Sequence, residues 1–261
     1  MPARAIDAAL AALCAVDRDG VLTVDLGELE WVPPSAIVAT IAQAARARAA
    51  GRDFAVRGPR GELSSYAARM RLGRMLDALD VHHDLPPQRE RDQSEHLVEL
   101  REIDSGSAAD RLAALVYRKT RAVDESLARA LHQSVGEIAD NVPDHAGSVG
   151  FVVAQTLPRR RQLVLAVGDA GVGMYATLAT RGARDDEHAI VLATRDHVSR
   201  FDDPDRGIGL PTALQLIKGR GGSVYIASGS ASVRHFPRTR RFLASPMPYP
   251  GTLVEARIAL D

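Results

Sequence analysis

The sequence predicts a mixed α/β protein with two domains. We expect an α/β unit at residues 1–88, a linker at 89–106, and a two-layer α/β sandwich with a mixed sheet at 107–261. Strand-like and helix-like stretches alternate in the first unit, which is typical of a small βαβ arrangement. Beyond the linker, a long helical stretch is followed by strand patterns separated by turn residues. With 261 residues, 46% of them hydrophobic, the chain can bury two cores.

In the first unit, β-rich stretches at residues 21–26 and 53–57 flank an alanine-rich helical stretch at residues 35–50. Gly51 follows that helix at the position where a glycine commonly ends one. Residues 63–79 carry apolar side chains at helical spacing. The unit is predicted to close near Leu85.

The predicted linker is polar and follows Pro86 and Pro87. Its second half is also compatible with a salt-bridged helix, because Glu95 and Glu99 stand four residues apart. The boundary between the two units is therefore set only to within several residues.

The second unit begins with a helical region at residues 107–145, broken near 119–123. Strands at 149–156 and 162–167 follow, joined by a turn that contains Pro158. A helix is predicted at 210–218, and the remaining strands are predicted at 223–228, 241–244 and 252–260.

Charge and composition exclude several classes of function. The chain has 33 basic and 33 acidic residues, so no electrostatic attraction to nucleic acid or anionic lipid is expected. Cys14 is the single cysteine, and the N-terminal residues lack the pattern of a signal peptide. No apolar run approaches the roughly 20 residues that cross a bilayer. We expect a cytoplasmic protein without membrane contact of its own.

The first motif whose side chains could take part in catalysis or binding pairs Glu137 with Asn141. These residues stand four apart on a predicted helix, so the carboxylate and the amide lie on the same side. Such a carboxylate can deprotonate a hydroxyl nucleophile, and an amide oxygen can bind Mg²⁺. Taken alone, the pair is more typical of a solvated helix surface.

The second motif, at residues 167–173, follows a β stretch. Asp169 offers an acceptor for an adenine amino group, while Gly171 and Gly173 allow backbone conformations and close approaches that a Cβ forbids. Taken alone, it is also typical of an ordinary Asp-Gly turn.

The third motif opens a predicted helix and comprises Arg206, Gly207, Ile208, Gly209 and Leu210. Glycines at a helix start expose backbone N–H groups to an anion such as a phosphate. A flexible loop entering a helix is the plain alternative. A P-loop is excluded, because neither lysine of the chain follows a glycine in the required arrangement.

The three motifs, in this order, resemble the GHKL superfamily of gyrase, heat-shock chaperone, histidine-kinase and mismatch-repair ATPases, and Gly251-Thr252 resembles a fourth family element. The resemblance covers residues 107–261 and implies a Bergerat-type fold with ATP and Mg²⁺ as cofactors. It also implies that residues 174–205 form a lid over the nucleotide. Its implied roles are Glu137 as general base, Asn141 as Mg²⁺ ligand, Asp169 with Gly171 and Gly173 at the adenine, and Arg206, Gly207, Ile208, Gly209, Leu210 and Thr252 on the phosphate side.

The first unit resembles the STAS domain of anti-anti-sigma factors, through the pattern at residues 24–26, the segment 31–35, the alanine-rich helix and the following strand. In that family a serine at the start of this helix is phosphorylated, and Ser35 stands at the corresponding place. The plainer interpretation is that Ser35 caps the helix, as serine at a helix start usually does.

Together, the resemblances imply an ATP-binding regulator: an anti-sigma-type serine/threonine kinase or ATPase of a bacterial partner-switching system. Its partner would be a sigma/anti-sigma-type regulator or a STAS protein, and a homodimer is left open. The alternative is a non-catalytic interaction module switched by ATP. Pro143 favours it, because a proline two residues after Asn141 removes a helical N–H. A fragment of a sensor histidine kinase is a third interpretation, disfavoured by the missing membrane span and phosphoacceptor box.

Overall fold

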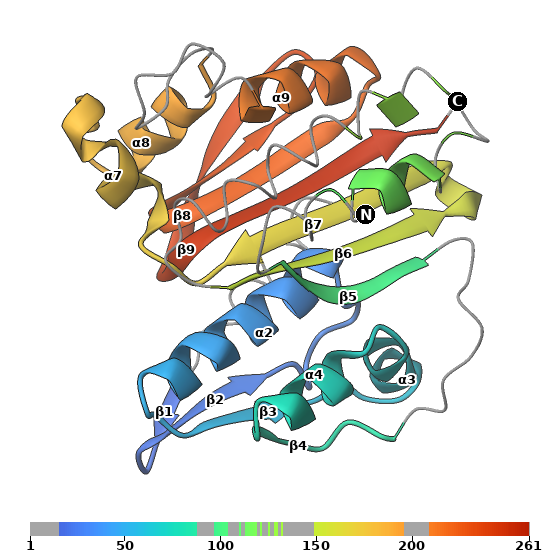
Figure 1. Cartoon of the computed structure of the whole chain (residues 1–261), viewed down its shortest axis with the longest axis vertical. Coiled ribbons are helices and arrows are strands. Elements are labelled where there is room, and N and C mark those ends of the chain that lie inside the picture. Colours follow the sequence, from blue (N-terminus) through green and yellow to red (C-terminus); the bar gives the residue numbers. More distant parts are fainter. Residues whose placement is uncertain are drawn as a thin grey trace.

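The computed structural model describes residues 16–87, 97–103, 149–195 and 209–260, together with residues 110, 113–118, 121, 125, 128–129 and 132. These residues form a 4-stranded sheet and a 5-stranded sheet with helices packed against them, so the predicted α/β class is confirmed (Figure 1). Within these ranges, no helix combines the length and the apolar character needed to cross a membrane.

The smaller sheet has the strand order β1-β2-β3-β4. β1 pairs antiparallel with β2, while β2/β3 and β3/β4 are parallel, so the helices between them are crossovers of βαβ type. The strands are β1 (Val16–Arg18), β2 (Val21–Asp25), β3 (Phe54–Arg57) and β4 (His82–His83), and the helices are α2 (Pro34–Ala49), α3 (Glu62–Arg69) and α4 (Leu72–Ala78). The predicted strands and the alanine-rich helix are confirmed.

Two backbone positions explain where these helices end. Gly51 has φ +64°, the left-handed conformation expected of the glycine just after α2. The helical stretch predicted at 63–79 is two helices, because Arg71 between them adopts φ 69°.

The larger sheet has the strand order β5-β6-β7-β9-β8. Its strands are β5 (Leu97–Ile103), β6 (Gly150–Leu157), β7 (Gln162–Asp169), β8 (Ser223–His235) and β9 (Arg240–Ala259). β6 and β7 are joined through the short helix η1 (Pro158–Arg160), where a turn was predicted. β8 and β9 form a hairpin: β8 extends beyond the strand predicted at 223–228, and the strands predicted at 241–244 and 252–260 are both parts of β9.

Two expectations for the linker and the second unit are corrected. A mixed sheet was expected, yet every described neighbouring pair is antiparallel, because β9 lies between β7 and β8, which run in the same direction, and keeps them apart. The helix considered for the second half of the linker is wrong. Residues 97–103 are strand β5, whose buried Val98 and Leu100 belong to the cores on opposite faces of the sheet.

Helix α2 lies between the two sheets (Figure 1). One continuous core joins it to both, including Ile37 and Ile41 of α2, Val56 of β3 and Val153 of β6. Because most of α2 is buried on all sides, its alanines let both sheets approach closely. We call the part of the chain up to residue 87 the N-terminal half and the part from residue 97 the C-terminal half. The two halves therefore share a core.

Helix α3 adds polar contacts between the halves. Arg69 donates to the buried carboxylate of Glu99 on β5 at 2.6 Å, and the Tyr66 hydroxyl donates to Gln155 Oε1 on β6 at 2.7 Å. Burial opposes ionisation of Glu99, but the hydrogen bond and charge of Arg69 outweigh it and hold its pKa below the ordinary value.

The other face of the larger sheet carries α7 (Gly173–Leu178), α8 (Asp186–Ala193) and α9 (Gly209–Gly219) (Figure 1). Side chains of α9 and of Val167, Ile226 and Val254 in the strands form the core on this face. Helices α7 and α8 also share a small cluster around Leu178 and Ala189.

Candidate functional site

Three polar side chains stand in one row across adjacent strands of the larger sheet. Val167 and Val254 lie in the core beneath α9, so Asp169 and Thr252, two residues away on β7 and β9, face the same side. Ser228 of β8 is the register partner of Thr252 and shares this face. The row lies where β7 ends and the chain turns toward α7. We call residues 169–173 the Asp169 turn.

Asp169 is a buried carboxylate. Its side chain is 6% exposed, and Oδ1 accepts a hydrogen bond from Gly171 N at 2.7 Å. Burial raises the pKa of this carboxyl to about 6, although backbone hydrogen bonds from Gly171 and Thr252 act in the opposite direction. A carboxylate kept where its charge is costly is typical of a functional position.

Glycine is required beside Asp169. A Cβ on Gly251 would lie 2.5 Å from Asp169 Oδ1, and Gly251 has φ +87°. The glycine of the Gly251-Thr252 pair thus brings β9 close enough for the Thr252 backbone to donate to Asp169.

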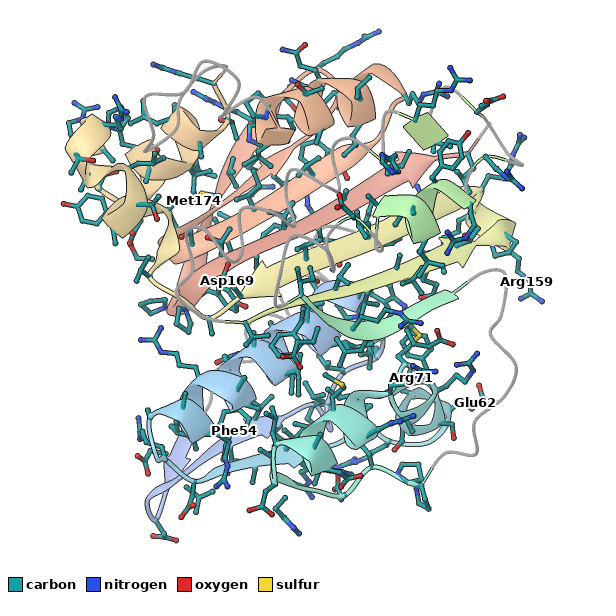
Figure 2. The ribbon with its side chains drawn as sticks, viewed as in Figure 1. Phe54, Glu62, Arg71, Arg159, Asp169 and Met174 are labelled. Carbon is teal, nitrogen blue, oxygen red and sulfur yellow. The ribbon has the colours of Figure 1, made fainter. Side chains whose placement is uncertain are left out.

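Ser228 anchors the far end of the Asp169 turn. Its Oγ accepts from Met174 N at 2.8 Å and donates to Gly251 O at 2.9 Å. Gly173 has φ +77°, and a Cβ there would lie 3.0 Å from Ser228 Oγ. Figure 2 shows Asp169 at the end of β7 and Met174 in α7. Ser228 is not predictable from the sequence, because a serine within a strand pattern carries no signal that it bonds two distant backbone groups.

The structure thus brings together Asp169, Gly171, Gly173 and Thr252 among the predicted site residues. Gly209 begins α9, and Leu210 packs against the core on the same face of the sheet. The remaining predicted positions lie outside the described residues: Glu137, Asn141, Arg206, Gly207 and Ile208.

Ser35 lies on the opposite face of the larger sheet. The cap of α2 is Pro33, so the interpretation of Ser35 as the helix cap is wrong. Ser35 is fully buried, and its backbone N donates to Glu255 Oε2 at 3.2 Å. Glu255 also accepts from Arg257 Nε at 2.9 Å. Phosphorylation of Ser35 stays a prediction, and it requires this end of α2 to leave the sheet.

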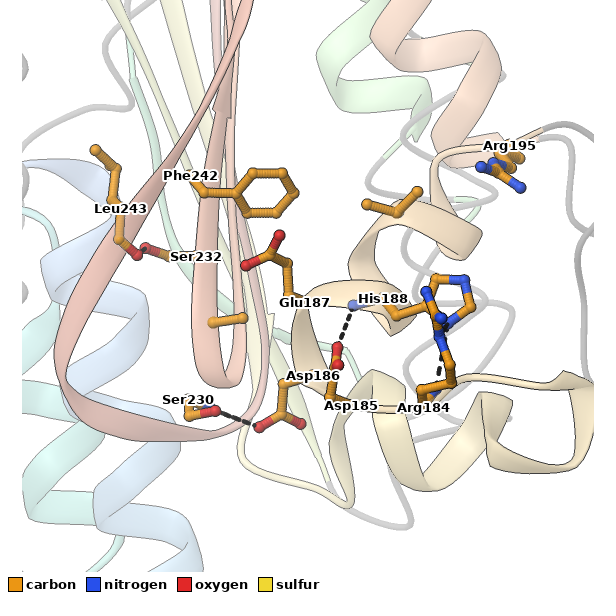
Figure 3. A pocket seen from close by; sticks show the side chains of 12 residues that line it. Arg184, Asp185, Asp186, Glu187, His188, Arg195, Ser230, Ser232, Phe242 and Leu243 are labelled. Carbon is orange, nitrogen blue, oxygen red and sulfur yellow. Dashed lines mark hydrogen bonds between the residues drawn. The ribbon is translucent and has the colours of Figure 1, made fainter.

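A cavity of about 700 Å³ lies between α8 and the β8–β9 hairpin (Figure 3). Its lining mixes acidic side chains such as Glu187 with basic ones such as Arg184, so it has no single charge preference. Asp186 fixes α8 to the hairpin, because one carboxylate oxygen accepts from both Ser230 N and Ser230 Oγ at 2.8 Å. The described part of the predicted lid is therefore attached to the sheet at this point.

The chain was compared with protein-family models and with curated proteins. No family model matches it, and no curated protein matches it.

Proposed function

We propose that this chain is an ATP-binding regulatory protein of the GHKL type, with a Bergerat-type nucleotide domain and a STAS-like N-terminal domain. The observation that carries the proposal is the buried carboxylate of Asp169 beside the glycine turn and Thr252. A carboxylate in a dry site, fixed by backbone N–H groups, is a suitable acceptor for the amino group of an adenine.

The residues around Asp169 fit this role. Asp169 and Thr252 offer an ionisable acceptor and a hydroxyl group on one face, which suits a nucleoside. Ser228 beside them holds the end of the turn, because its hydroxyl is already bonded to Gly251 O and Met174 N. Phosphates would lie toward the start of α9, where Gly209 and Leu210 begin a helix of the same layer.

The metal is tied to positions outside the described ranges. We assign Mg²⁺ to Asn141 and the general base to Glu137, as the resemblance implies. In the part of the chain that the structure describes, no three His, Cys, Asp or Glu side chains come together as metal ligands. The magnesium would supply charge neutralisation for the ATP phosphates.

We propose phosphotransfer to a serine or threonine of a protein partner, or ATP hydrolysis, as the activity. The partner would be a regulator of the sigma/anti-sigma type or a STAS protein, and a cytoplasmic location belongs to the same proposal. Ser35 is a candidate acceptor. Mass spectrometry of the protein after incubation with Mg²⁺ and ATP tests it, and an unmodified Ser35 under turnover conditions excludes that residue.

Equilibrium binding of Mg²⁺-ATP to the wild type and two variants tests the function. Asp169→Asn is expected to abolish binding, while Glu137→Ala binds normally and releases no phosphate or phosphoprotein. Equal affinity in the Asp169 variant would refute the adenine assignment. A wild type that binds no ATP would refute the proposal as a whole.

A second candidate is a module that binds ATP without catalysis and presents a surface to a partner. The observation that favours it is the exposure of two large apolar side chains, Val172 within the Asp169 turn at 60% and Tyr175 just after it at 41%. Normal ATP binding without any phosphate release by the wild type would select this candidate.

A further inference from the structure

A side chain of the N-terminal half forms two hydrogen bonds with the Asp169 turn. Arg46 belongs to the last turn of α2, and its Nη1 donates to Ala170 O at 3.0 Å and to Gly171 O at 3.2 Å. These carbonyls lie inside the segment that carries the candidate nucleotide contacts. We propose that Arg46 positions the Asp169 turn and thereby sets the affinity of the site for nucleotide. This inference rests on the proposed function.

One of these hydrogen bonds, to Ala170 O, acts on the same peptide plane as Asp169. The peptide between Ala170 and Gly171 has its C=O bonded to Arg46 and its N–H bonded to Asp169 Oδ1. Because the N–H and C=O of a trans peptide point in opposite directions, Arg46 and Asp169 hold this plane from its two sides. Loss of the arginine frees the plane to rotate, and the carboxylate then loses one of its donors.

Arg46 can act in this way because α2 is itself fixed on the sheet. A Cβ on Gly168 would lie 3.0 Å from Val38 Cγ1, so helix and strand are already in close contact next to the turn. At the other end of α2, Ser35 N donates to Glu255 Oε2. With its helix held at two points, Arg46 has a defined position relative to β7.

The consequence is a coupling between the halves of the chain. If docking of α2 orders the Asp169 turn, nucleotide binding stabilises the docked arrangement by the same free energy, because linkage is reciprocal. A ligand or modification that moves α2 would then change nucleotide affinity without touching the nucleotide.

Arg48 offers a matched control. It stands two residues further along α2, and its guanidinium pairs with Asp80 of the same half at 3.1 Å. Arg48→Ala removes the same charge from the same helix end and leaves the Asp169 turn alone. Arg46→Lys keeps the charge and can restore one donor, so it tests the hydrogen bond separately from the charge.

The experiment compares the full-length wild type with Arg46→Ala, Arg46→Lys and Arg48→Ala. Calorimetry with a non-hydrolysable ATP analogue and Mg²⁺ gives Kd, and amide exchange by NMR without nucleotide reports on Gly171 N. For Arg46→Ala we expect both Kd and the exchange rate of Gly171 N to rise about five- to tenfold. This is the effect expected from losing about one to two charge-assisted hydrogen bonds at a partly exposed site. Arg46→Lys should lie in between, and Arg48→Ala should stay within about twofold of the wild type.

Three outcomes decide the matter. A selective rise in Kd and exchange for Arg46→Ala supports the proposal. Equal effects of the two alanine variants, or a normal Kd in Arg46→Ala, overturn it. A wild type that binds no nucleotide overturns the proposed function instead, and the exchange rate of Gly171 then decides alone whether Arg46 holds the turn.

Discussion

Replacing Asp169 by asparagine tests the candidate site through stability as well as binding. The substitution keeps the shape of the side chain and removes an ionisable group whose charge is costly in its buried position. The variant should therefore lose nucleotide binding and yet resist unfolding better than the wild type at neutral pH. Loss of function with gain of stability separates a site residue from a structural one.

The magnitude follows from the pKa. Burial raises it from 3.8 to about 6, and about 2 pKa units correspond to about 3 kcal/mol of unfolding free energy. Well below pH 3.8 the carboxyl is protonated in both states and costs nothing. Between pH 4 and 6 the unfolded chain ionises first, so wild-type stability falls as pH rises, and above pH 6 the penalty is complete. Asparagine forgoes about 1 kcal/mol of hydrogen bonding with the backbone N–H groups.

Urea unfolding between about pH 3 and pH 8 measures the difference. The variant should be less stable than the wild type by about 1 kcal/mol near pH 3 and more stable by about 2 kcal/mol at pH 7. Asp80→Asn is the control, because Asp80 is an exposed carboxylate whose substitution should leave no such reversal. A difference between wild type and Asp169→Asn that does not vary with pH would refute a buried, ionised Asp169.

Three further substitutions address the structure around the site and the contact between the halves. Gly173→Ala should lower the free energy of unfolding, measured with urea, by about 2 kcal/mol, and Gly182→Ala by about 1 kcal/mol. Both glycines have a positive φ, but only at Gly173 would the added Cβ meet another side chain. Ser228→Ala should cost about 1–3 kcal/mol in the same assay and weaken ATP binding, since the buried Gly251 O and the partly buried Met174 N lose their partner; unchanged stability would contradict this. Arg69→Ala should cost about 3 kcal/mol at pH 7 by stranding the buried Glu99 carboxylate. The Arg69–Glu99 stabilisation, present above the ordinary glutamate pKa, should disappear as pH falls through the lowered pKa, so the measured cost should shrink in acid.

Local patterns were sufficient to predict most of the described elements. The β-rich runs at 149–156 and 162–167 and the glycine after the alanine-rich helix identify their structures, because neighbouring residues determine them. Strand β5 was not predictable in the same way. Leu97 and Leu100 match helical spacing, and pairing with β6, distant in the sequence, decides the outcome. The position of β9 between β7 and β8, which makes the sheet antiparallel, is likewise set by long-range pairing.

For the site, the sequence predicted residues that could bind a ligand, but not the side chains that hold those residues in place. Asp169 and the glycines stand out only because their motif lies between the Glu137/Asn141 motif and the glycines before the helix at 210–218, since an Asp-Gly turn alone is ordinary. Ser228 and Arg46 do not, since each matters through a backbone atom more than fifty residues away. Side chains that bond to distant main-chain groups have no spacing to reveal them.

The position of α2 has a consequence for anything that separates the halves. The inward face of the larger sheet presents Phe151, Ala166 and Leu253, each at most 2% exposed, and α2 is what keeps them dry. Moving the N-terminal half away would expose an apolar surface to water, at a free-energy cost that grows with the exposed area. A molecule that displaces α2 must therefore cover this sheet face with an apolar surface of its own. A C-terminal half expressed without α2 should self-associate through the same face.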